Sequence, residues 1–131
     1  MGSSTTSGYK LKAIDEMATL HGGAVKLAGA ELGVESFGIQ VLDFPAGFEH
    51  YPEHDHAYDG QEEIYVVLRG SAEFLVDGER VAIDSGRMLY VEPGAKRKLL
   101  PGPEGVRILA LGCTRGGAYE RPEDFRLEVM S

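Results

Sequence analysis

Two histidines and a glutamate near the middle of the chain have the types and spacing of metal ligands. His54 and His56 stand two positions apart, which on an extended strand directs both imidazoles to the same face. Glu63 follows after a short loop and opens an apolar run that ends at Gly70. Two neutral imidazoles and one carboxylate on converging strands bind divalent iron or a similar ion. Three of the four histidines of the chain fall between positions 50 and 56, and this clustering favours a site.

The residues around this set leave alternatives open. Adjacent residues of a strand point to opposite faces, so at most one of Glu62 and Glu63 lies beside the histidines. His50 precedes Pro52 in a stretch without a strand pattern; we expect an exposed loop histidine there, with an auxiliary metal ligand as the alternative. Tyr65 shares the predicted face of Glu63 and either packs in the core or lines a pocket, where it would be a candidate catalytic residue.

Short strands between turn residues should position these side chains. Asp77-Gly78, between two apolar runs, is a strong signal for a two-residue hairpin. Many short strands with turns at this spacing predict an all-β sandwich or barrel. We also expect a short N-terminal helix over 10–20 and, more weakly, a strand over 24–32. The other strands are expected at 36–44, 63–69, 71–76, 80–83, 87–92, 98–100 and 106–111, the last two separated by the turn residues 101–105.

The chain is long enough for one domain, with 131 residues. We expect a leader over 1–9, a helix and strand extension over 10–35, a barrel over 36–112 and a tail over 113–131. A net charge of −8 argues against nucleic acid as a partner. No run has the apolar length of a membrane span. The single cysteine, Cys113, excludes an internal disulfide, fits the reducing cytoplasm and is expected to be buried.

Two motifs of this sequence resemble those of the cupins. The first has a glycine, the pair His-x-His, a glutamate and a second glycine, found here as Gly47, His54 and His56, Glu63 and Gly70. Six residues separate Gly47 from His54, and the loop between His56 and Glu63 is longer than usual. The distance to Gly70 matches Glu63 to the motif glutamate, which leaves Glu62 as the second choice.

The second cupin motif is a glycine, a short strand, Pro-Gly and then a histidine. Gly86 to Arg97 match this motif except at the last position, where Arg97 stands in place of the fourth ligand of the family. A guanidinium is always protonated and cannot bind a metal. Three alternatives remain for Arg97. It neutralises Glu63 in a metal-free pocket, it binds an anionic group of a substrate, or it points outward into solvent.

The resemblance covers about residues 36–112 and implies an antiparallel jelly-roll barrel with a site in its mouth. It also implies a homodimer, since cupins commonly dimerise, and the strands 64–68 and 106–111 are apolar on both faces. We expect a divalent ion (Fe, Mn, Ni or Zn) at His54, His56 and Glu63, with Arg97 orienting a small anionic substrate. A metal-free module that binds or senses a small molecule without catalysis is the alternative.

Overall fold

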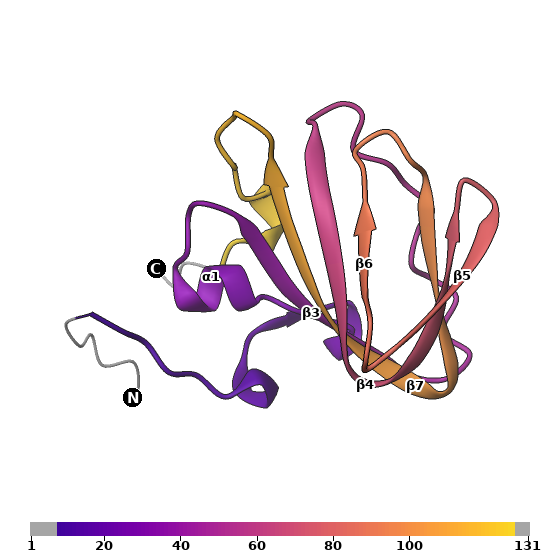
Figure 1. Cartoon of the computed structure of the whole chain (residues 1–131). Helices are drawn as coiled ribbons and strands as arrows, with labels where there is room; N and C mark the ends of the chain where they lie inside the picture. The colour runs from indigo at the N-terminus through magenta and orange to yellow at the C-terminus, as the bar shows by residue number, and fades with distance from the viewer. Residues whose placement is uncertain (1–7, 128–131) are drawn as a thin grey trace.

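The computed structural model describes residues 8–127, and in this part the chain is mostly β-structure (Figure 1). One antiparallel sheet has the strand order β1-β2-β3-β7-β4-β5, and β6 pairs with β4. The strands are β1 (Thr19–Leu20), β2 (Val25–Lys26), β3 (Gly38–Phe44), β4 (Gln61–Val76), β5 (Glu79–Asp84), β6 (Met88–Val91) and β7 (Arg97–Thr114). The helical elements are α1 (Ala28–Leu32) and the 3-10 turns η1 (Ile14–Glu16), η2 (His21–Gly23) and η3 (Glu123–Phe125). The predicted antiparallel β-fold with one short helix is confirmed.

The two long strands, β4 and β7, curl the sheet on itself. They pair from Gln61↔Thr114 to Val76↔Arg97, with irregular register on both sides of Gly70. A Cβ atom on Gly70 would lie 2.2 Å from the Gly105 carbonyl oxygen, and both glycines have positive φ angles, so the bend requires glycine. Each long strand therefore replaces two predicted strands, and the turn predicted at 101–105 is wrong because β7 continues through it.

The inner face of the curled sheet holds the main core. Tyr65, Phe74, Leu99 and Ile108 are fully buried there. The predicted hairpin at Asp77-Gly78 is confirmed: both residues have positive φ, and β4 and β5 pair directly up to Val76↔Glu79. This geometry fits the twist of the flanking strands.

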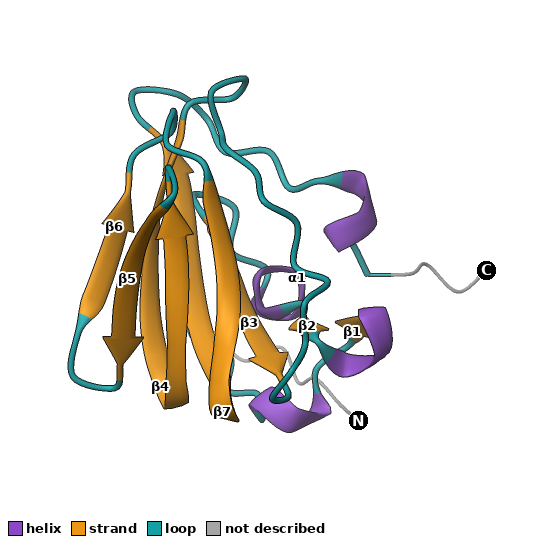
Figure 2. Cartoon of the chain, turned by 90° about the vertical axis from the view of Figure 1, so that its right-hand side faces the viewer, coloured by secondary structure: helices purple, strands orange, loops and turns teal. Residues whose placement is uncertain are grey.

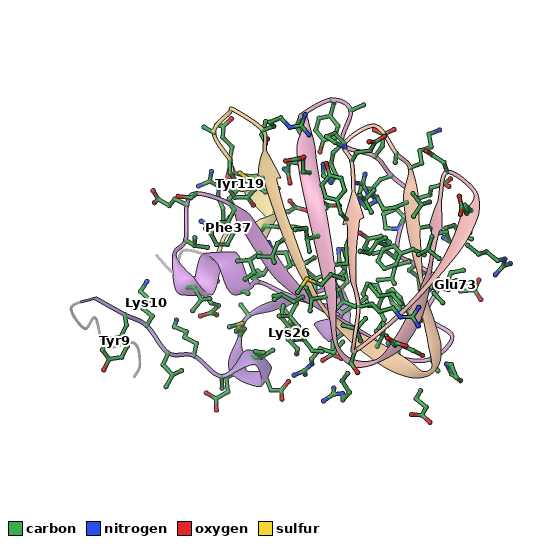
Figure 3. All side chains as sticks on the ribbon, viewed as in Figure 1. Tyr9, Lys10, Lys26, Phe37, Glu73 and Tyr119 are labelled. Carbon is green, nitrogen blue, oxygen red and sulfur yellow. The ribbon has the colours of Figure 1, made fainter. Side chains whose placement is uncertain are left out.

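The segment before β3 packs on the outer face of the sheet (Figure 2). Met17 and Ala28 form a second apolar cluster there with Val41 of β3. Lys26 of β2, labelled in Figure 3, is buried, with its Nζ 3.8 Å from Asp15 and 3.9 Å from Asp43. The short helix is α1, so the helix predicted over 10–20 is misplaced, and of the strand predicted over 24–32 only β2 forms, because α1 takes up the rest. The first of these ranges holds only the turn η1 and the two-residue strand β1.

Further along the outer face, side chains of β4 and β6 are open to solvent. Ile64 and Leu68 of β4 and Met88 and Tyr90 of β6 are exposed. Cys113 is also exposed, so its predicted burial is wrong; its Sγ lies 3.5 Å from the Ser36 carbonyl oxygen. Among residues 8–127, no helix has the length and apolar content needed to cross a membrane.

Candidate metal centre

Backbone hydrogen bonds fix both histidines of the predicted set. The His54 N–H donates to the Arg97 carbonyl (3.0 Å) and the Arg97 N–H donates to the His54 carbonyl (2.8 Å), a bridge to the start of β7. The His56 N–H donates to the Pro93 carbonyl (2.8 Å). The two rings meet edge to face, with centroids 5.2 Å apart, so the sequence spacing does bring the imidazoles together.

Glu63 joins the histidines and Glu62 does not. Glu63 Oε2 lies 3.4 Å from His56 Nε2. Glu62 accepts hydrogen bonds from Tyr90 and Arg115, which are exposed. The alternation of side chains along β4 thus separates the two carboxylates as predicted.

Arg97 lies inside the protein. Its side chain is 0% exposed, and its Nε lies 3.5 Å from Glu63 Oε1, so the outward-pointing interpretation is wrong. The terminal nitrogen Nη2 of Arg97 donates a hydrogen bond to the Glu92 carbonyl (3.3 Å). Nε is at ion-pair distance from Glu63 without hydrogen-bond geometry, and Nη1 has no hydrogen-bond partner within the described residues. A buried guanidinium with unused donors can accept an anionic partner.

Two tyrosines stand behind Glu63. The Tyr65 hydroxyl donates to Glu63 Oε1, and the Tyr51 hydroxyl lies 3.5 Å from that of Tyr65. Tyr65 is fully buried, and burial together with the nearby Tyr51 and Glu63 raises the pKa of its hydroxyl well above the ordinary value. This proton stays in place at neutral pH, so Tyr65 holds one oxygen of Glu63.

One donor atom from each of His54, His56 and Glu63 lies within 4.8 Å of the other two, so these residues could hold a metal ion. His54 Nδ1 lies 3.0 Å from the Pro52 carbonyl oxygen, and a ring proton donated there leaves Nε2 as the free donor. The 3.4 Å between His56 Nε2 and Glu63 Oε2 matches two ligands of one ion with bonds of about 2.1 Å. The residues therefore fit a divalent metal.

The charges around His56 and Glu63 stabilise the ionised form of each side chain. Burial raises the pKa of Glu63, but hydrogen bonds with His56 and Tyr65 and the charge of Arg97 outweigh it, so that pKa lies below the ordinary value. Burial lowers the pKa of His56, but Glu63 and Asp59 outweigh it and raise that pKa above its ordinary value. Without a metal, the His56 ring can thus carry a proton between two carboxylates.

His50 lies apart from the three donors, whereas Asp59 lies directly beside one of them. His50 is exposed, with its ring against Phe48, and it is not among the three grouped donors; this agrees with the expected loop histidine. Asp59, which was not predicted from the sequence, has its carboxylate 3.1 Å from His56 Nδ1. The sequence did offer a signal. Asp59 stands three residues after His56, a candidate ligand, and next to Gly60, where a turn can bring its carboxylate back to the ring.

The chain belongs to the cupin family. Residues 40–112 match the family model described as the cupin domain. A cupin protein from Bacteroides fragilis has a similar structure, with a TM-score of 0.69 and 20% identity; the match covers 96% of this chain and 100% of that one. The cupin fold predicted from the two motifs is thereby confirmed.

Two other solved structures are similar over part of the chain. The DMSP lyase DddQ from Ruegeria pomeroyi is 30% identical, with a TM-score of 0.53, over 61% of this chain and 39% of that one. A candidate sugar phosphate isomerase from Acidithiobacillus ferrooxidans is 24% identical, with a TM-score of 0.59, over 67% and 56%. The chain thus spans well under two thirds of either protein. No curated protein matches the sequence significantly.

Proposed function

We propose that the protein binds one divalent ion at His54, His56 and Glu63 and acts as a metal-dependent enzyme on a small anionic molecule. The observation that carries the proposal is the convergence of the three donors within 4.8 Å, at the face where Glu63 is already ionised. When bound, a divalent ion at such a site polarises a coordinated oxygen as a Lewis acid. Fe, Mn, Ni and Zn all suit this donor set.

The charge balance of the site favours an anionic ligand. Glu63 and Arg97 neutralise each other, so a divalent ion adds two positive charges, and Asp59 offsets one of them. An excess of positive charge in a partly buried site attracts anions. In this proposal Arg97 orients the anionic group through its unused Nη1, while Tyr65 and Arg97 hold the Glu63 oxygen that faces away from His56.

A lyase or isomerase reaction suits the proposed site. The similar structures include a lyase and a candidate isomerase, and a Lewis-acid site beside a fixed cation is compatible with either reaction. Tyr65 is buried and hydrogen-bonded to Glu63, so we assign it the positioning of that carboxylate. Its direct participation in catalysis stays a prediction.

A metal-free binding module is the second candidate, and the Arg97–Glu63 pair favours it. The two side chains lie 3.5 Å apart and compensate each other without an ion. In such a module Arg97 would bind the anionic ligand directly, and no bond would be made or broken.

Elemental analysis separates the two candidates. Protein purified without added metal should contain one divalent ion per chain, and His54→Ala/His56→Ala should contain none. His50→Ala is the matched control, because this histidine lies in the same loop outside the set, and it should keep the metal. Equal and negligible metal in wild type and in the double variant would refute the enzyme proposal.

The role of Arg97 in anion binding has its own test. Arg97→His would supply the fourth ligand of the family motif, so it should tighten metal binding and weaken the thermal stabilisation by oxalate or phosphate. If neither property changes, Arg97 does not bind the anion.

We also propose a homodimer formed through the outer face of β4 and β6. Ile64, Leu68, Met88 and Tyr90 are exposed there, whereas the outer face of β3 and β7 is covered by the N-terminal segment. An uncovered apolar sheet face favours association.

A further inference from the structure

A tight turn over residues 56–60 places a carboxylate behind the His56 ring. The Gly60 N–H donates to the His56 carbonyl (2.7 Å), and Gly60 has a φ of +72°, which favours glycine. The turn brings Asp59 back to the ring, where its two carboxylate oxygens lie 3.1 and 3.3 Å from His56 Nδ1. The ring is therefore flanked by Asp59 at Nδ1 and by Glu63 at Nε2.

Asp59 is itself held in place. The Gln61 N–H donates to Oδ1 (3.2 Å) and the Gln61 side-chain amide donates to Oδ2 (3.1 Å). The Thr114 hydroxyl of β7 donates to the Asp59 carbonyl (3.1 Å). Contacts from β4 and β7 thus hold both the backbone and the carboxylate, and the side chain is only 26% exposed. This makes Asp59 a preorganised hydrogen-bond acceptor.

We propose that Asp59 is a positioning residue that fixes the tautomer and orientation of His56. When the Asp59 carboxylate accepts a hydrogen bond from Nδ1–H, the ring proton stays on Nδ1 and the lone pair of Nε2 is directed at Glu63. The ion of the proposed function would bind there, so the inference rests on that function. Glu63 is the weaker competitor for the ring proton. It lies farther away, at 3.4 Å, and its charge is already compensated by Arg97 and by the Tyr65 hydroxyl.

The two imidazoles of the site consequently differ in donor strength. His54 Nδ1 faces the neutral carbonyl of Pro52 at 3.0 Å, whereas His56 Nδ1 faces a carboxylate. A carboxylate behind the ring raises the basicity of a histidine ligand more than a carbonyl does. Asp59 therefore makes His56 the stronger of the two nitrogen ligands.

Nuclear magnetic resonance of the metal-free protein tests the tautomer without any metal. In ¹⁵N-histidine-labelled protein at a pH above the raised pKa of His56, long-range ¹H–¹⁵N spectra should show the ring proton on Nδ1. Asp59→Ala should move it to Nε2, and Asp59→Asn should keep it on Nδ1 because the amide oxygen can still accept. Asp55→Ala is the control, since Asp55 accepts the Ala57 N–H instead, and it should match wild type.

Zinc affinity, measured by competition calorimetry, gives the second readout. Asp59→Ala should weaken binding about 10- to 100-fold, with Asp59→Asn in between and Asp55→Ala close to wild type. A wild-type ring with its proton on Nε2, or equal affinities for Asp59→Ala and Asp55→Ala, would overturn the role of Asp59. If wild type binds no zinc but its tautomer depends on Asp59, the proposed metal function fails and the positioning role stands.

Discussion

Replacing Arg97 by methionine removes the buried cation that faces Glu63. Breaking a buried ion pair by deleting one partner costs about 3–5 kcal/mol, because the other charge is left buried. Glu63 is 14% exposed and keeps His56 and Tyr65 as partners, so the lower value, about 3 kcal/mol, applies. With an unfolding entropy of about 2.1 cal/mol/K per residue and 131 residues, the melting temperature should fall by about 11 °C.

Differential scanning calorimetry with a chelator present measures this cost in the metal-free protein. The proteins to compare are wild type, Arg97→Met, Glu63→Gln and the double variant. The double variant should be more stable than Arg97→Met, since no uncompensated charge remains in it. Added zinc should restore stability to Arg97→Met more than to wild type. A melting temperature for Arg97→Met within about 2 °C of wild type, less than about 1 kcal/mol, would show that the pair contributes little and refute this reasoning.

Three further predictions concern the site, the surface and the pH dependence. Glu63→Gln should abolish stoichiometric metal binding and Glu62→Gln should not, as elemental analysis of the two variants would show; equal metal in both would mean that Glu63 is not the ligand. Met88→Lys on β6 should convert the proposed homodimer to a monomer by light scattering, and a monomeric wild type would exclude the dimer. The hydrogen bond from Lys12 lowers the pKa of Glu31 below its ordinary 4.5, so Glu31 contributes stability at neutral pH that is lost as the pH falls through that lowered pKa. The stability difference between wild type and Glu31→Gln, measured by thermal unfolding, should therefore close in acid, and a constant difference would contradict the linkage.

The sequence predicted the sheet better than the N-terminal segment. The hairpin Asp77-Gly78 depends on local backbone preferences, which the residues themselves encode. A helix of only five residues, such as α1, depends on tertiary packing more than on propensity. Gly29 of α1 lies so close to the backbone of β3 that a Cβ atom on it would be 3.2 Å from the Ile39 carbonyl oxygen. In the range 10–20 only η1 and the two-residue strand β1 form, and Met17 packs against Val41 of β3 from an extended backbone rather than from a helix.

The convergence of His54, His56 and Glu63 could be predicted from the sequence, whereas the residues that support them could not. Alternation along a strand is enough to separate Glu62 from Glu63. The burial of Arg97 could not be derived, because a charged residue beside Lys96 and Lys98 is equally typical of a solvated surface. Asp59 lies in a loop, where side-chain direction depends on the turn geometry that only the structure shows.

The bridge between His54 and Arg97 uses backbone atoms only, so it does not depend on which side chain stands at position 97. His54 is held by main-chain atoms at position 97, which every residue except proline offers equally. The side chain at this position can therefore change during evolution without displacing the neighbouring histidine. In the proposed function, a histidine at position 97 would add a fourth metal ligand, whereas the arginine adds a cation. The main-chain hydrogen bonds that hold His54 would be kept in both cases, while the charge of the side chain beside Glu63 changes.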